Sequence, residues 1–141
     1  MTTFTSQLLQ WPLARAFANG AIGTIITSFD VWASRLPKIE IHGSRGSLLV
    51  PDPNMFGGQV WLRKAEERDW QEVPLVSGHV ENSRGIGVAE MAAAMDAGRP
   101  HRCSGELAFH VLDIMHAFHD SSVTRHFATL RSSCESPAPL F

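Results

Sequence analysis

The hydrophobic pattern of this chain changes its period near residue 76, and this change limits the fold more than any other feature. Before that point apolar and polar residues alternate, most clearly over residues 38–42, which is typical of half-buried strands. After it, Val88, Met91, Ala92 and Met95 recur at the spacing of one helical face. Strands followed by helices predict an α+β fold, with an open, mostly antiparallel β-sheet and two C-terminal helices packed on one of its faces.

Turn motifs divide the first half of the chain into strands. Asn19-Gly20 predicts a hairpin, because both residues tolerate positive φ. Gly43-Ser44-Arg45-Gly46 predicts a second tight turn. The strands expected on this basis cover residues 13–18, 21–31, 38–42, 47–50, 59–63 and 70–74. Together they form an antiparallel meander over residues 13–76.

Two amphipathic helices follow, and each has recognisable end signals. Asn82 or Ser83 can cap the first helix, and Gly98 stands where a C′ glycine belongs. Ser104 can cap the second helix. Its apolar stripe consists of Leu107, Val111, Ile114, Met115 and Phe118, and its more polar side of His110, Asp113, Ala117 and Asp120. A last strand is expected over residues 127–131.

Composition excludes several classes of function. Twelve basic and 14 acidic residues give a net charge of −2 without a long basic run, so we expect no nucleic-acid partner. No apolar run approaches the roughly 20 residues that span a bilayer, so we expect no membrane contact. Cys103 and Cys134 make neither a disulfide framework nor a metal quartet, and free thiols favour a cytoplasmic location.

Motifs for catalysis, cofactor or metal binding are weak. His116 and His119 have the spacing of metal ligands, but no third cluster converges on them, and a solvated polar face is the favoured interpretation. Gly85-Ile86-Gly87 resembles part of a dinucleotide fingerprint, yet Glu90 stands where its third glycine belongs. We therefore predict no catalytic, cofactor-binding or metal-binding residue in this chain.

Arg84, His101 and Arg102 are the candidate substrate-binding residues. They fall at a helix start and in the loop between the two helices. There a donor-rich pocket for a sugar hydroxyl or a phosphate can form. Structural ion pairs and carbonyl contacts are the alternative role for the same side chains.

Several segments match one known family in order and spacing. They are Phe17-Ala18-Asn19-Gly20-Ala21-Ile22-Gly23-Thr24-Ile25, Ser28-Phe29-Asp30-Val31-Trp32, Ile39-Glu40-Ile41-His42-Gly43-Ser44-Arg45-Gly46-Ser47-Leu48 and Val50-Pro51-Asp52-Pro53-Asn54. With the stretch from Arg84 to Met115, they resemble the C-terminal domain of the glucose-fructose oxidoreductase / inositol dehydrogenase / MocA (Gfo/Idh/MocA) family. The resemblance implies a leader over residues 1–15, the family's C-terminal domain over 16–131 and a tail over 132–141.

That resemblance implies a parent enzyme that oxidises or reduces sugars or polyols with NAD(P). Its cofactor-binding Rossmann domain and the Glu-Lys-Pro motif with the catalytic lysine have no counterpart in this sequence. We therefore expect a substrate-pocket and oligomerisation domain that binds no cofactor and is inactive alone. It would form a homo-oligomer through the open sheet face, or work with a separate cofactor-binding chain.

Other interpretations remain open. The chain is either a truncated gene product or a functional split subunit. A stand-alone ligand-binding or assembly module on the same sheet is the alternative function. A small independent enzyme is a third interpretation, for which the sequence offers no acid–base pair.

Overall fold

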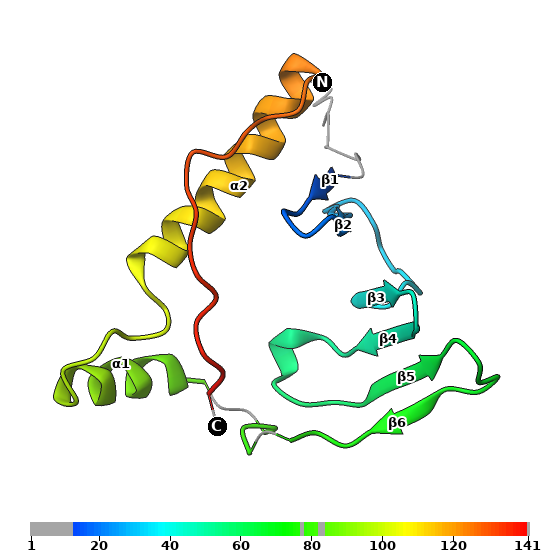
Figure 1. Ribbon diagram of the computed structural model, residues 1–141, viewed down its shortest axis with the longest axis horizontal. Helices are drawn as coiled ribbons and strands as arrows, with labels where there is room; N and C mark the ends of the chain where they lie inside the picture. The colour runs from blue at the N-terminus through cyan, green and yellow to red at the C-terminus, as the bar shows by residue number, and fades with distance from the viewer. Residues whose placement is uncertain (1–12, 77, 82–83, 141) are drawn as a thin grey trace, which may run out of the picture. The chain divides into compact units, whose positions relative to one another are not determined.

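The computed structural model describes residues 13–76, 78–81 and 84–140, and the side chains from residue 16 onwards (Figure 1). The chain divides into two compact units, Met1–Arg35 and Leu36–Phe141. Its elements give an α+β fold with an open antiparallel sheet and two helices, as predicted. The packing of both helices on one sheet face and the domain boundaries at 15/16 and 131/132 stay predictions.

The first unit contains one antiparallel hairpin. Strand β1 (Leu13–Ala16) pairs with β2 (Ile22–Ile25) from Leu13 opposite Ile25 to Ala16 opposite Ile22. The expected strand over 21–31 is too long, because β2 already ends at Ile25. Beyond it the Asp30 N–H donates to Ser28 Oγ at 3.2 Å. Such local side-chain bonds compete with a strand ladder for the backbone.

The turn of this hairpin differs from the two-residue turn that Asn19-Gly20 predicts. The Gly20 N–H donates to the Phe17 carbonyl and the Phe17 N–H to the Ala21 carbonyl, both at 2.9 Å. Gly20 has φ +85°, whereas φ of Asn19 is not positive. This is a three-residue loop that needs one left-handed residue, and glycine supplies it. Asn19 contributes through its side chain, whose Oδ1 accepts the Ala21 N–H at 3.1 Å.

A four-stranded antiparallel sheet forms the first half of the second unit. Its strands are β3 (Ile39–Gly43), β4 (Gly46–Val50), β5 (Val60–Lys64) and β6 (Gln71–Val73), and they are ordered β3-β4-β5-β6 (Figure 1). Each strand therefore pairs with its neighbour in sequence, which confirms the predicted meander for these four strands. The predicted meander of six is split between this sheet and the separate β1–β2 hairpin.

The two faces of the sheet differ in polarity. Residues opposite each other on neighbouring strands lie on the same face, and residues alternate along a strand. The pairing places Ile39, Ile41, Leu48, Val50, Val60, Leu62 and Val73 on one side, the apolar face. It places Glu40, His42, Ser47, Leu49, Trp61, Arg63 and Glu72 on the other. None of the apolar-face residues is buried, and Ile41 is 53% exposed.

Close approach of β4 and β5 explains one glycine of the β3–β4 turn. A Cβ at Gly46 would lie 2.5 Å from the Arg63 carbonyl oxygen of β5, whereas one at Gly43 would meet nothing closer than 3.7 Å. Residue 46 must therefore be glycine for this pairing, while residue 43 need not be.

After β4 the chain forms a short 3₁₀ helix, η1 (Pro53–Met55), within the predicted loop. The Asp52 side chain caps it, because Oδ1 accepts the Asn54 N–H at 2.9 Å. Proline occupies the first helical position, where the missing N–H costs nothing.

Helix α1 (Ile86–Asp96) starts without a side-chain cap. Gly85 is its N-cap residue, with φ +93°. The predicted caps, Asn82 and Ser83, lie outside the described residues. A left-handed N-cap is unusual, and glycine adopts it without the strain that a Cβ would bring.

The end of α1 follows the prediction. Gly98 has φ +61°, its N–H donates to the Met95 carbonyl at 3.1 Å, and the Arg99 N–H donates to the Ala94 carbonyl at 3.0 Å. This pair of bonds is a Schellman motif, in which glycine takes the left-handed C′ position.

The buried side of α1 was predicted wrongly. Ala94 is completely buried and Glu90 is 8% exposed, whereas Val88 and Met95 are about 70% exposed or more. The helix face that carries Val88 and Met95 is therefore exposed to solvent. Glu90 and Ala94 lie one turn apart, and the contacts of the Glu90 carboxylate determine which side of the helix is covered.

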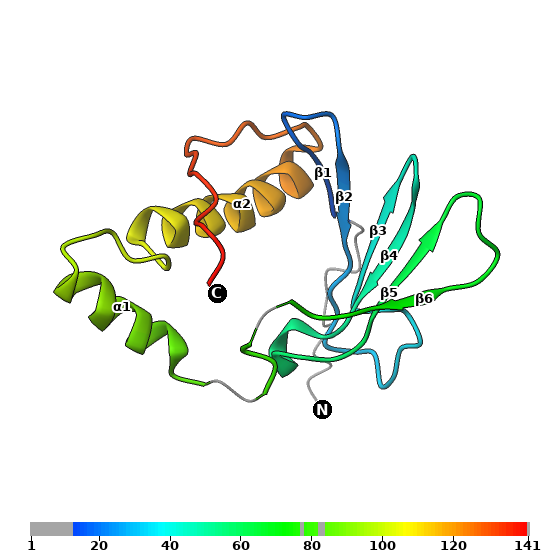
Figure 2. The same cartoon turned by 60° about the horizontal axis from the view of Figure 1, so that its bottom comes forward.

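Helix α2 (Gly105–Thr124) begins as predicted at Ser104, whose Oγ accepts the Leu107 N–H at 3.2 Å. It ends at Arg125, which has φ +58°. The expected strand over 127–131 does not form, and residues 127–140 contain neither helix nor strand (Figure 2). None of the described helices combines the length and hydropathy needed to cross a bilayer.

Candidate functional site

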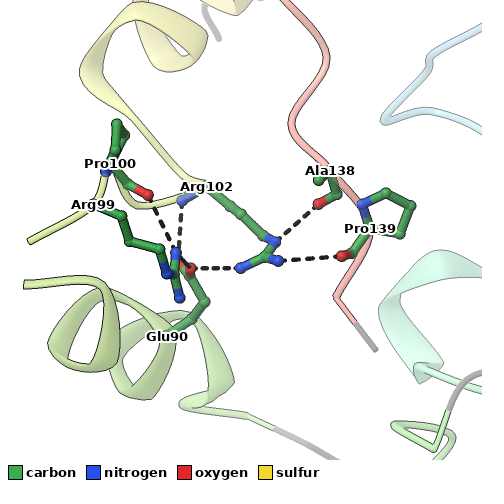
Figure 3. Close-up of polar contacts among 6 residues, drawn as sticks. All are labelled: Glu90, Arg99, Pro100, Arg102, Ala138 and Pro139. Carbon is green, nitrogen blue, oxygen red and sulfur yellow. Dashed lines mark hydrogen bonds and ion pairs between the residues drawn. The ribbon is translucent and has the colours of Figure 1, made fainter. Parts of the chain in front are cut away.

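A carboxylate on α1 collects the polar groups of the loop that follows the helix. Glu90 Oε1 accepts from Arg99 Nη1 and from Arg102 Nη1, each at 2.7 Å (Figure 3). Its Oε2 accepts the Arg102 backbone N–H at 3.0 Å. Both carboxylate oxygens are therefore engaged, and charge-assisted bonds of this kind are the stronger ones.

These contacts hold Glu90 in its ionised form. The backbone N–H of Arg102 contributes most, followed by the Arg99 guanidinium, and together with the Arg102 side chain they outweigh the opposing effect of burial. They lower the pKa of Glu90 from 4.5 to about 2. A carboxylate with such a low pKa is a poor general base at neutral pH, so its role is to bind the two arginines.

Arg102 also contacts the chain end. Its Nε donates to the Ala138 carbonyl at 2.8 Å and its Nη2 to the Pro139 carbonyl at 3.2 Å (Figure 3). All three guanidinium nitrogens of this predicted substrate-binding residue thus already donate to protein oxygens. A guanidinium carries five N–H groups, and these three bonds engage one hydrogen on each of its nitrogens.

Arg84 makes its described contacts with the η1 segment. Its Nη2 donates to Asn54 Oδ1 at 2.6 Å, and its guanidinium carbon lies 5.6 Å from the centre of the Phe56 ring. A hydrogen bond to a side-chain amide oxygen and a cation–π contact favour the structural role considered for these residues. These contacts therefore fix the start of α1 against the loop that follows β4.

His101 has an unused polar atom. Among the described residues that are not exposed, its Nδ1 is the buried side-chain nitrogen or oxygen without a hydrogen-bond partner. A buried nitrogen without a hydrogen-bond partner lowers the stability of the fold, and a bound molecule that hydrogen-bonds to it would remove this cost. Of the three predicted residues, His101 and Arg102 are adjacent in the loop and Arg84 is held by η1. Substrate binding by the three stays a prediction.

A second carboxylate, Asp113 on the polar side of α2, holds the segment that follows this helix. Asp113 Oδ2 accepts the backbone N–H of Arg131 at 2.8 Å, the N–H of Ser132 at 3.0 Å and the Ser132 hydroxyl at 2.8 Å. The Ser132 hydroxyl bond, with the two N–H groups, lowers the pKa of Asp113. The Arg131 N–H is therefore not available to a strand ladder at the end of the expected strand over 127–131, and no strand forms there.

Ser132 also lies 2.9 Å from His110 Nδ1, so a serine, a histidine and an aspartate meet here. The serine hydroxyl donates its single hydrogen to Asp113, so His110 Nδ1 must carry the hydrogen in the second contact. In a catalytic triad the histidine accepts the serine hydrogen and the aspartate orients the histidine. The order of bonds here is different, and it anchors the tail without activating the serine.

The described part of the chain contains no cluster of metal-binding side chains. No three His, Cys, Asp or Glu side chains come together there in a way that could hold an ion. His119 Nδ1 lies 3.8 Å from Asp120 Oδ1, and both side chains are about two-thirds exposed. This fits the solvated polar face considered for His116 and His119.

The sequence carries an ambiguous signal for the Glu90 cluster and none for the Asp113 cluster. Glu90 precedes Arg99 by 9 residues and Arg102 by 12. A Schellman glycine between them turns the chain back, so this spacing can bring the charges together. Asp113 gave no comparable signal, because its partners are backbone N–H groups 18 and 19 residues away.

No family model, curated protein or solved structure matches this chain. The Gfo/Idh/MocA assignment therefore stays a prediction based on the motifs quoted above. What the chain does is inferred from its own residues and bonds.

Proposed function

We propose that this chain is the substrate-side and assembly domain of an NAD(P)-dependent sugar or polyol oxidoreductase of the cytoplasm, and that it is inactive alone. The motif resemblance supplies the enzyme class. An α+β chain with an open antiparallel sheet and two C-terminal helices has the architecture which that resemblance implies.

The observation that carries the assembly role is the uncovered apolar face of the four-stranded sheet. Seven aliphatic side chains share this face, of which Ile39 and Ile41 are exposed and the other five are half-buried. Aliphatic side chains that stay partly exposed on neighbouring strands support an interaction site on this face. Val111 and Met115 of α2 are also exposed, so the predicted helix stripe needs cover as well.

A second copy of the chain is the proposed partner for this surface. Strands β3 and β6 end the four-stranded sheet on its two sides, and an uncovered edge strand readily pairs with another chain. A separately encoded cofactor-binding chain would complete the enzyme. It would bring the Rossmann domain and the catalytic lysine that the family implies.

A stand-alone ligand-binding module is the second candidate, and His101 is the observation that favours it. Its buried Nδ1 lacks a hydrogen-bond partner, so a hydroxyl group of a polyol could satisfy it. Arg102 argues the other way, because its nitrogens are engaged by Glu90 and the chain end. Saturable binding of a polyol that is lost in His101→Ala, with the fold retained, would select this candidate.

Titration with NADH and NADPH tests the first candidate. Calorimetry and nicotinamide fluorescence should show no binding to the purified chain, because the glycine fingerprint is incomplete and Glu90 occupies the place of its third glycine. Binding at micromolar concentration of either nucleotide would contradict the proposal, since it would require a cofactor site within this chain.

A further inference from the structure

Two carboxylate-based anchors hold the chain end, and they lie close together in sequence. At the upstream anchor, Asp113 of α2 binds the backbone N–H groups of Arg131 and Ser132. At the downstream anchor, Arg102 binds the carbonyls of Ala138 and Pro139, while Glu90 of α1 binds Arg102. One segment is therefore bonded both to α2 and to the loop that α1 holds.

We propose that residues 131–140 form a strap whose two anchors are energetically coupled, so that release of either end weakens the other. The strap makes α1, the loop after it and α2 respond as one unit. This device is independent of the proposed oxidoreductase role, and it uses only contacts within the chain.

The short distance between the anchors supports the coupling. Only residues 133–137 separate the upstream anchor from the downstream one, and Pro137 restricts φ in this stretch. When one end is bound, a short restricted connection keeps the other end at a high effective concentration near its partner. Loss of one anchor therefore lowers the effective concentration of the other strap end near its own binding partner.

The contacts at both anchors involve main-chain atoms of the strap, apart from the Ser132 hydroxyl. Main-chain recognition makes the strap's position depend on Asp113 and Arg102 more than on its own side chains. Substitutions at those two residues, which lie outside the strap, are therefore the sharpest way to release it.

Hydrogen exchange measured by NMR tests the coupling. Removal of residues 138–141 should accelerate exchange of the Arg131 and Ser132 amides several-fold, although Asp113 is untouched. Arg102→Lys should do the same with the chain end intact, because lysine cannot reproduce the fork of donors. Glu135→Gln, an exposed change between the anchors, is the control and should leave these amides unchanged.

The coupling must also be reciprocal, as any linkage between two binding events is. Asp113→Asn should accelerate exchange of the Arg102 Nε hydrogen, which donates to Ala138, whereas Asp120→Asn on the exposed side of α2 should not. Retained protection of the α2 amides would show that the helix which carries Asp113 is folded in each variant. If Arg131 and Ser132 exchange at the original rate in folded Arg102→Lys, the proposal is overturned.

Discussion

At the scale of single residues, two carboxylates organise the C-terminal half of this chain. Glu90 binds two arginine side chains and one backbone N–H, and Asp113 binds two backbone N–H groups and a hydroxyl. Glu90 is buried and Asp113 is half-buried. Removing one charge from such a cluster leaves its partners poorly compensated, so these two positions matter more than their helical surroundings suggest.

Glu90→Gln should therefore destabilise the chain. The substitution keeps the shape of the side chain but removes the charge that Arg99 and Arg102 share, and we expect thermal unfolding several degrees lower. Glu66→Gln changes an exposed carboxylate and should leave the melting temperature unaltered. Equal melting temperatures for the two variants, followed by circular dichroism, would show that the cluster contributes nothing to stability.

The same cluster predicts a defined dependence on pH. The pKa of Glu90 in the folded chain is lowered from 4.5 to about 2, so the unfolded chain takes up the proton first. The stabilisation is complete above pH 4.5 and is lost as the pH falls towards 2. The carboxyl carbon of Glu90, followed by NMR, should titrate near the lower value. A midpoint near 4.5 would mean that the arginines do not hold the carboxylate.

At the scale of helices and strands, local signals predicted the structure well. The predicted turn at Gly43–Gly46 joins β3 and β4 in a hairpin, Ser104 caps α2 and Gly98 ends α1. In each case the deciding bond or dihedral lies within a few residues of the signal. Such features depend on the neighbouring backbone alone, which is why a sequence pattern can specify them.

Two glycines of the α1 region should respond to alanine with opposite signs. Gly98→Ala meets no close atom, but φ +61° forces the Cβ into a strained conformation and should cost about 1–2 kcal/mol. Gly87→Ala lies in the first turn of α1 with open space around it and should stabilise the helix by up to about 1 kcal/mol. Urea unfolding of both variants measures the difference; changes of the same sign would contradict the Schellman end.

Predictions that depended on distant partners failed. The helical period of Val88 and Met95 identified α1 as a helix, but these side chains are exposed, and the buried side carries Glu90, which two arginines bind. The strand over 127–131 looked plausible from its residues, yet Asp113 takes the N–H groups at its end. For the candidate site, the sequence indicated Arg102 as a donor residue, with ion pairs and carbonyl contacts as its alternative role, but not which carboxylate and carbonyls it binds.

At the scale of the whole molecule, much apolar surface remains uncovered. Ala94 is the buried hydrophobic residue among those described, while large side chains of both units are exposed. A chain that buries so little of its own apolar surface gains little of the hydrophobic stabilisation that folding requires. A partner that covers the apolar face of the sheet would supply the rest.

Light scattering of the purified chain over a micromolar concentration series tests this central claim most directly. We predict the mass of a dimer or larger assembly. We also predict a fall towards the monomer mass in Ile41→Glu, because assembly would bury the glutamate charge on the apolar face without an opposite charge beside it. Glu40→Gln on the opposite face of β3 should keep the assembly. A monomer mass for the unmodified chain throughout the series would contradict the account.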